Sequence, residues 1–150
     1  MAGIFEKIKA HLTEDKLKTV YRFVSEREKR AIEACDISGI GSTWEQDSRR
    51  NTHKYKEGVR YVHFVANKHD TQDVYRELKR SKCYLCTYRI PNSILKKYAG
   101  KGFYPPHGYD NSYTEIKEYA IPSEQYNPEW LQKITLVNPA LQEEMADLYK

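Results

Sequence analysis

Residues 111–122 read NSYTEIKEYAIP, a pattern that predicts a β-strand. Threonine, isoleucine, tyrosine and alanine alternate with charged residues, and the run ends at a proline. Side chains two residues apart on a strand share a face, so Ile116, Glu118 and Ala120 are expected to point the same way. Glu118 is then either ordinary solvated surface or a carboxylate held in a pocket for a purpose, and the strand alone does not decide between them.

The length and composition indicate a soluble globular protein. A chain of 150 residues with 39% hydrophobic and 31% charged residues suits one domain with a true core. No apolar run approaches the length of a membrane span, and the N-terminus lacks a signal-peptide pattern. Three cysteines, an odd number, do not form a disulfide framework. We therefore expect a reduced, cytoplasmic protein without a membrane partner.

Charge is distributed unevenly along the chain. Residues 102–150 contain three lysines and eight carboxylates, a formal net charge of −5, whereas residues 1–101 carry +9. A basic front two-thirds suggests a phosphate-bearing ligand, either nucleic acid or a nucleotide. A solvated Lys/Arg surface explains the same charges equally well.

The remaining elements mix strands and helices without regular βαβ order, which favours an α+β fold in a single domain, 1–150. An amphipathic helix is expected within residues 1–18, and a C-terminal helix at 139–150. Residues 37–58 and 101–110 have no clear period and are expected to be loops. Further strands are expected at 18–24, 59–67, 82–91 and 133–137, and further helices at 25–36, 69–81 and 92–100.

Most catalytic and metal motifs are missing from the sequence. Cys83 and Cys86 form a lone CxxC without the further ligands that zinc needs, so buried structural cysteines are expected and no metal site is assigned. No GxSxG, Walker or GxGxxG motif is present. Nucleophilic catalysis and a phosphate-binding P-loop therefore have little support.

Polar residues stand within three otherwise apolar strands. Arg22 lies in VYRFV, His63 and Tyr61 share one face of RYVHFV, and Glu118 lies in the strand quoted above. Taken singly, each has an ordinary explanation: an edge-strand arginine, a hydrogen-bonded histidine and a surface glutamate.

Taken together, these residues resemble the ADP-ribosyltransferase superfamily. The motifs are a first-strand Tyr-Arg followed by SEREKRAIEACDISGI, the aromatic strand YVHFVAN, and EIKEYAIPSEQYNPEWL, over about residues 19–134. The nearest resemblance is to the nucleic-acid-directed toxin branch that modifies thymidine on DNA, and more distantly to RNA 2′-phosphotransferases. The sequence departs from the Arg-directed branch, since it lacks Ser-Thr-Ser, and from the His-Tyr-Glu branch, since Arg22 stands in place of histidine.

The resemblance implies a fold, a cofactor and roles for particular residues. The fold would be α+β, with split mixed or antiparallel β-sheets flanked by helices. Glu118 would be the catalytic carboxylate of an enzyme that uses NAD. The expected cofactor-binding residues are Tyr21, Arg22, Tyr61 and His63, of which Arg22 would hold a phosphate or ribose.

The resemblance also implies a macromolecular acceptor, which we expect to be DNA or RNA. In the superfamily the turn before the catalytic strand selects the acceptor, and aromatic residues on a loop can stack on unpaired bases. Arg49, Arg50, Lys54 and Lys56 could follow a phosphate backbone. The expected acceptor-binding residues are Phe103, Tyr104, His107, Tyr109, Arg49 and Arg50. A rigid aromatic surface loop is the alternative explanation.

These implications predict a toxin or defence effector with an antitoxin protein as a further partner. Two alternatives remain open: a catalytically inactive copy of the fold, and an unrelated small module, either of which would bind nucleic acid or a partner protein. The enzyme requires Arg22, Glu118 and either His63 or Tyr61 to converge on one cleft. The inactive fold allows a side chain to block that cleft, and the unrelated module leaves Glu118 exposed.

Overall fold

The computed structural model describes residues 16–43, 50–67, 83–104 and 114–148. The helices are α2 (Glu26–Glu33), α4 (Asn92–Lys97) and α5 (Pro139–Leu148), with single 3-10 turns η1 (Ile37–Gly39), η3 (Ser123–Gln125) and η4 (Pro128–Trp130). The strands are β1 (Leu17–Val24), β2 (Ser42–Thr43), β3 (Arg50–Asn51), β4 (Arg60–Val65), β5 (Tyr84–Pro91), β6 (Ala99–Tyr104), β7 (Thr114–Pro122) and β8 (Leu131–Leu136). Among these described helices, none is long and apolar enough to cross a membrane.

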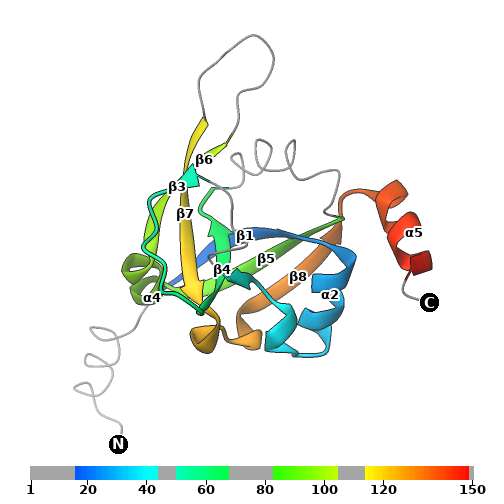
Figure 1. Cartoon of the computed structure of the whole chain (residues 1–150), viewed down its shortest axis with the longest axis horizontal. Coiled ribbons are helices and arrows are strands. Elements are labelled where there is room, and N and C mark those ends of the chain that lie inside the picture. The colour runs from blue at the N-terminus through cyan, green and yellow to red at the C-terminus, as the bar shows by residue number, and fades with distance from the viewer. Residues whose placement is uncertain (1–15, 44–49, 68–82, 105–113, 149–150) are drawn as a thin grey trace, which may run out of the picture.

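The eight strands form one antiparallel sheet, with α2 packed beside it (Figure 1). The strand order is β3-β6-β7-β4-β1-β5-β8, and β2 pairs with β4 outside this path. Helices and strands are not organised into parallel βαβ units. The expected α+β class is therefore confirmed.

The sheet opens between β1 and β4. β1 pairs with β5 over eight residue pairs, but it pairs with β4 only at Tyr21 and Val65. On the other side, β4 pairs with β7 from Tyr61 to Val65. The sheet therefore consists of two halves, β1-β5-β8 and β4-β7-β6-β3, whose strand pairing is reduced to one residue pair at the junction.

The larger core lies on the sheet face that α2 covers. Its strand residues include Val20, Phe64, Tyr88 and Ile121, and Ile32 of α2 packs against them. The opposite face carries a smaller cluster of Phe23, Val65 and Ile116. Burial of apolar side chains on both faces explains why β4 and β7 form the buried centre of the sheet.

Strand alternation follows the sequence prediction. Glu118 pairs with Val65 of β4 on one side and with Gly100 of β6 on the other. Residues that pair across antiparallel strands point to the same face. Ile116, Glu118 and Ala120 therefore share a face, as expected.

The two regions expected to be loops contain short elements instead. Residues 37–58 include η1, β2 and β3, and residues 101–104 belong to β6. The helix expected at 92–100 ends at Lys97, so that Gly100 is a strand residue. Pairing with β7 along its whole length holds β6 extended despite its two glycines.

Several other boundaries also differ from those expected. Leu17 and Lys18 belong to β1, and residues 1–15 of the expected N-terminal helix lie outside the described residues, as does the helix expected at 69–81. Helix α2 ends at Glu33, after which Cys35 has a φ of 53°. The Cys35 side chain is exposed.

Thiol reactivity tests this core. Cys83 and Cys86 are fully buried, and burial raises the pKa of the Cys86 thiol to about 12. Because the thiolate is the reactive species, we expect an aromatic disulfide reagent near neutral pH to modify Cys35 alone in the native protein. Cys35→Ser should abolish this fast reaction, and all three thiols of the wild type should react after unfolding. Fast modification of Cys86 in the native protein would contradict the packing.

Candidate functional site

The Glu118 carboxylate is buried within the β4-β7-β6 half of the sheet. The residue is 1% exposed, and its Oε1 accepts a hydrogen bond of 3.0 Å from Nε2 of His53. A Cβ added at Gly102 would lie 2.6 Å from the carboxylate carbon, so only glycine leaves room at this position of β6. Burying a carboxylate is costly unless it is hydrogen-bonded or paired, and the structure supplies such a contact.

The segment after β3 carries His53 onto the carboxylate. Asn51 pairs with Gly102, and its side-chain Oδ1 accepts from the amide of His53 at 3.1 Å. The amide of Thr52 donates to the carbonyl of Lys101, and the amide of Lys101 donates to the Thr52 hydroxyl, both at 2.9 Å. These bonds hold the chain against β6 and place the His53 ring in contact with the Glu118 carboxylate.

Two further contacts fasten the same segment to β4. The Tyr55 hydroxyl and Nε2 of His63 share a hydrogen bond of 2.6 Å, and the amide of Lys56 donates to the Tyr61 hydroxyl at 2.9 Å. The rings of Tyr55 and Tyr61 meet edge to face with centroids 4.9 Å apart, and the rings of His53 and His63 lie 5.7 Å apart. A cluster of histidine and tyrosine rings therefore packs around His53, the residue that contacts the buried carboxylate.

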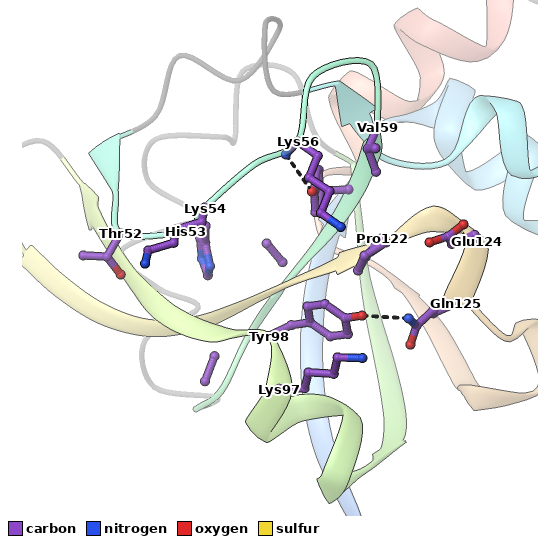
Figure 2. Close-up of a pocket in the computed structure, with 13 residues that line it drawn as sticks. Thr52, His53, Lys54, Lys56, Val59, Lys97, Tyr98, Pro122, Glu124 and Gln125 are labelled. Carbon is purple, nitrogen blue, oxygen red and sulfur yellow. Dashed lines mark hydrogen bonds between the residues drawn. The ribbon is translucent and has the colours of Figure 1, made fainter.

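A cavity of about 530 Å³ lies next to His53, between this segment, α4 and the end of β7. Figure 2 shows Lys56 and Lys97 approaching it from opposite sides, with Tyr98 between them. The Gln125 side-chain amide donates to the Tyr98 hydroxyl at 2.7 Å. The lining residues are Thr52, His53, Lys54, Lys56, Val59, Tyr61, Lys97, Tyr98, Ala99, Ala120, Pro122, Glu124 and Gln125.

Three of the expected cofactor-binding residues share the face of Glu118. Tyr21 pairs with Val65, which pairs with Glu118, so these side chains point the same way. Tyr61 and His63 follow at alternate positions of β4 and are each 5% exposed. The structure therefore brings Tyr21, Tyr61 and His63 onto the sheet face that carries Glu118.

Arg22 lies on the opposite face of the sheet, because it is one residue from Tyr21. Its Nε and Nη2 donate to the two carboxylate oxygens of Glu28 at 2.8 and 2.6 Å. Its Nη1 donates to the backbone carbonyl of His63 at 2.9 Å. Arg22 thus supplies a donor to β4 where β1 and β4 separate, and it does not converge with Glu118.

The expected acceptor-binding residues are only partly described. Phe103 pairs with Glu115, and therefore faces away from Glu118. The backbones of Arg50 and Tyr104 pair with Phe103 and Thr114. His107, Tyr109 and Arg49 lie outside the described residues.

Sequence reasoning missed His53 and Tyr55, which it left within a long loop. A signal was available in NTHKYK, residues 51–56, where asparagine, histidine and tyrosine alternate with threonine and two lysines. In the structure positions 51, 53 and 55 are partly buried and positions 52, 54 and 56 are exposed. A half-buried extended segment produces this period of two. The alternation predicts that the His53 and Tyr55 side chains pack against the protein while those of Lys54 and Lys56 are more exposed.

We expect Gly102→Ala to displace the Glu118 carboxylate, because the new methyl group would occupy its position. Overpacking of this kind costs about 1–3 kcal/mol, which urea unfolding would measure. The neighbouring Lys101→Ala removes an exposed side chain and should change stability by less than about 0.5 kcal/mol. Equal stability of Gly102→Ala and wild type would contradict the close approach.

We expect Arg22→Ala to destabilise the protein by roughly 3–5 kcal/mol, because it removes the guanidinium that pairs with the buried Glu28 carboxylate. The two side chains are only 13% and 10% exposed. Arg89→Ala on the adjacent strand β5 is the matched control, since Arg89 is exposed. A similar small loss for both variants in chemical denaturation would show that Arg22 has no structural role.

Comparison of the chain with protein-family models, curated proteins and solved structures gave no match. Within the described ranges, no group of three or more His, Cys, Asp or Glu side chains is arranged to hold a metal ion. Inference about function therefore starts from the buried Glu118, the side chains around it and the adjacent lysine-lined cavity.

Proposed function

We propose that the protein is an NAD-dependent ADP-ribosyltransferase with Glu118 as its catalytic carboxylate. The observation that carries this proposal is the burial of Glu118 in the middle of a sheet face, where a charged side chain contributes nothing to apolar packing. Buried ionisable groups with specific polar partners gather at functional sites. Here the partner is His53, and Tyr21, Tyr61 and His63 lie on the same face.

The architecture supports the proposal. The resemblance implies split sheets, whereas this chain has one eight-stranded sheet in which a single residue pair joins β1 to β4. The proposed carboxylate stands on β7, beside the strand that carries Tyr61 and His63. The thin junction between β1 and β4 and the adjacency of β7 and β4 are what supports the proposal from the fold.

The chemistry explains why a fixed carboxylate is needed. Bound NAD supplies the nicotinamide–ribose bond, and its cleavage develops positive charge on the ribose, as in glycoside hydrolysis. In our proposal the Glu118 carboxylate stabilises that charge and accepts a hydrogen bond from a ribose hydroxyl. The His53 ring covers Oε1, so it moves aside when the ribose binds. No side-chain nucleophile is required.

Arg22 does not meet the convergence with Glu118 that the resemblance requires, so in this proposal it has a different part from the one that the resemblance implies. Its guanidinium is engaged by Glu28 and the His63 carbonyl, so Tyr21 is the β1 residue that faces Glu118. The acceptor is proposed to be a macromolecule, with nucleic acid favoured, and the biological role that of a toxin or defence effector. The proposed acceptor-binding residues remain Phe103, Tyr104, His107, Tyr109, Arg49 and Arg50.

A catalytically inactive, binding-only protein is the second candidate. It is favoured by the same His53 contact, which covers the carboxylate, and by the position of Arg22 on the other face. In this case the cluster around Glu118 stabilises the segment 52–56 and the cavity beside it. A direct assay of NAD cleavage separates the two candidates.

We expect the wild-type protein to release nicotinamide from NAD in the presence of mixed DNA, RNA and protein acceptors. Glu118→Gln should lower the rate by about 100- to 1000-fold, the usual effect of removing a preorganised electrostatic group. Glutamine keeps the size of the side chain and retains an oxygen that can accept the hydrogen bond from His53. Glu115→Gln, an exposed position on the same strand, is the matched control and should retain wild-type turnover.

Equal turnover by Glu118→Gln and Glu115→Gln would remove Glu118 from the mechanism. Complete absence of NAD cleavage and NAD binding by folded wild-type protein would favour the binding-only candidate. Circular dichroism of each variant distinguishes loss of activity from loss of fold.

A further inference from the structure

The cavity beside His53 has a chemistry of its own, distinct from that of the buried carboxylate. Glu118 is not among its lining residues, and His53 lies between the two. A volume of about 530 Å³ is within the range of pockets that hold small organic ligands, roughly 300–1,000 Å³. Because Glu118 does not line the cavity, ligand binding there can be tested without transferase activity, although His53 and Tyr61 belong to both sites.

The charges around the cavity favour an anion. Three lysines, Lys54, Lys56 and Lys97, and one carboxylate, Glu124, line it, a formal net charge of +2 when His53 is neutral. In the part of the chain that the structure describes, no ion pair joins any of the three ammonium groups to a carboxylate. Like charges around one cavity repel each other, so an anion placed among them is stabilised.

The uncharged side chains favour a ligand with a flat, hydrogen-bonding part. The Tyr98 ring lines the cavity, with the Lys97 ammonium 5.5 Å from its centroid. The Gln125 amide donates to the Tyr98 hydroxyl, which fixes the orientation of both groups. The remaining amide oxygen of Gln125 offers an acceptor to the amino group of a base, and the tyrosine ring offers a surface for stacking.

Hydrogen bonds hold the segment 52–56, which forms one side of the cavity. The amide of Lys56 donates to Tyr61, and Tyr55, one residue earlier, bonds to His63. Lys54 and Lys56 therefore extend from a backbone that is attached on both sides. The two lysines can bind a charged ligand without a prior ordering of their backbone, and this lowers the entropic cost of binding.

We propose that this cavity binds a nucleoside monophosphate, with the phosphate among the three lysines and the base against Tyr98. A phosphate monoester carries a charge of about −1.5 to −2 near neutral pH, which matches the net charge of the lining residues. NAD has no monoester, because both of its phosphates are bridged, so the proposed ligand differs from the proposed cofactor. The monoester belongs either to a free nucleotide or to the phosphorylated end of a nucleic-acid strand.

Calorimetric titration of the full chain with AMP and with adenosine tests the proposal. We expect AMP to bind at least about tenfold more tightly than adenosine, because charge-assisted contacts to lysine are the stronger ones. Lys97→Gln and Lys56→Gln should each weaken AMP about tenfold without changing the affinity for adenosine. Lys133→Gln, an exposed position on β8, is the matched control and should bind AMP as wild type does.

Two further titrations define the ligand. NAD should bind at least about tenfold more weakly than AMP at this site, and equal affinity would overturn the monoester assignment. A trinucleotide should require its 5′-phosphate for binding, and tighter binding of this trinucleotide than of AMP would identify a strand end as the source. A preference for AMP over the trinucleotide would identify a free nucleotide.

The inference does not depend on the transferase activity. The AMP titration is repeated with Glu118→Gln, which keeps every residue of the cavity. Binding of AMP by this variant supports the site even if the wild type does not cleave NAD. The proposal fails if AMP and adenosine bind equally, if millimolar AMP does not bind to the folded protein, or if Lys97→Gln and Lys133→Gln behave alike.

Discussion

Burial of the Glu118 carboxylate constrains the residues around it more than any other single feature of this fold. The carboxylate needs space, which the absence of a side chain at Gly102 provides, and a polar partner, which His53 provides. The ring of His53 in turn needs space at Gly100, where an added Cβ would lie 2.6 Å from the imidazole. Both glycines of β6 are therefore explained by one buried charge, although glycine is otherwise unfavourable within a strand.

The same constraint connects the carboxylate to the cavity. Once His53 is held over Glu118, the following residues cross the end of β4, where Tyr55 meets His63 and the amide of Lys56 meets Tyr61. The alternate side chains of this segment, Lys54 and Lys56, then line the cavity. The ammonium groups of Lys54 and Lys56 are thus positioned by hydrogen bonds of the Tyr55 side chain and the Lys56 backbone amide.

The sequence predicted the local features of this arrangement and missed those that depend on distant pairing. The alternation in β7 and β4 correctly placed Glu118, Tyr61 and His63 on particular faces, because a strand has a period of two. The segment 50–56 was read as a loop, because its pairing with β6 and its contacts with β4 and β7 are formed by residues remote in sequence. Strand β6 was missed because glycine and lysine have low strand propensity, which pairing with β7 overrides.

Arg22 shows how a shift of one residue along a strand changes a functional inference, because neighbouring side chains point to opposite faces. Tyr-Arg in the first strand offers two neighbouring side chains, and the sequence does not determine which one faces Glu118. The pairing of Tyr21 with Val65 decides this, and it turns Arg22 toward Glu28 and the open junction between β1 and β4. A guanidinium on β1 can donate to Glu28 of α2 and to the His63 carbonyl of β4 at once, since its donors point in several directions. The residue that looked most like a phosphate ligand therefore acts in this structure as the link between the two halves of the sheet.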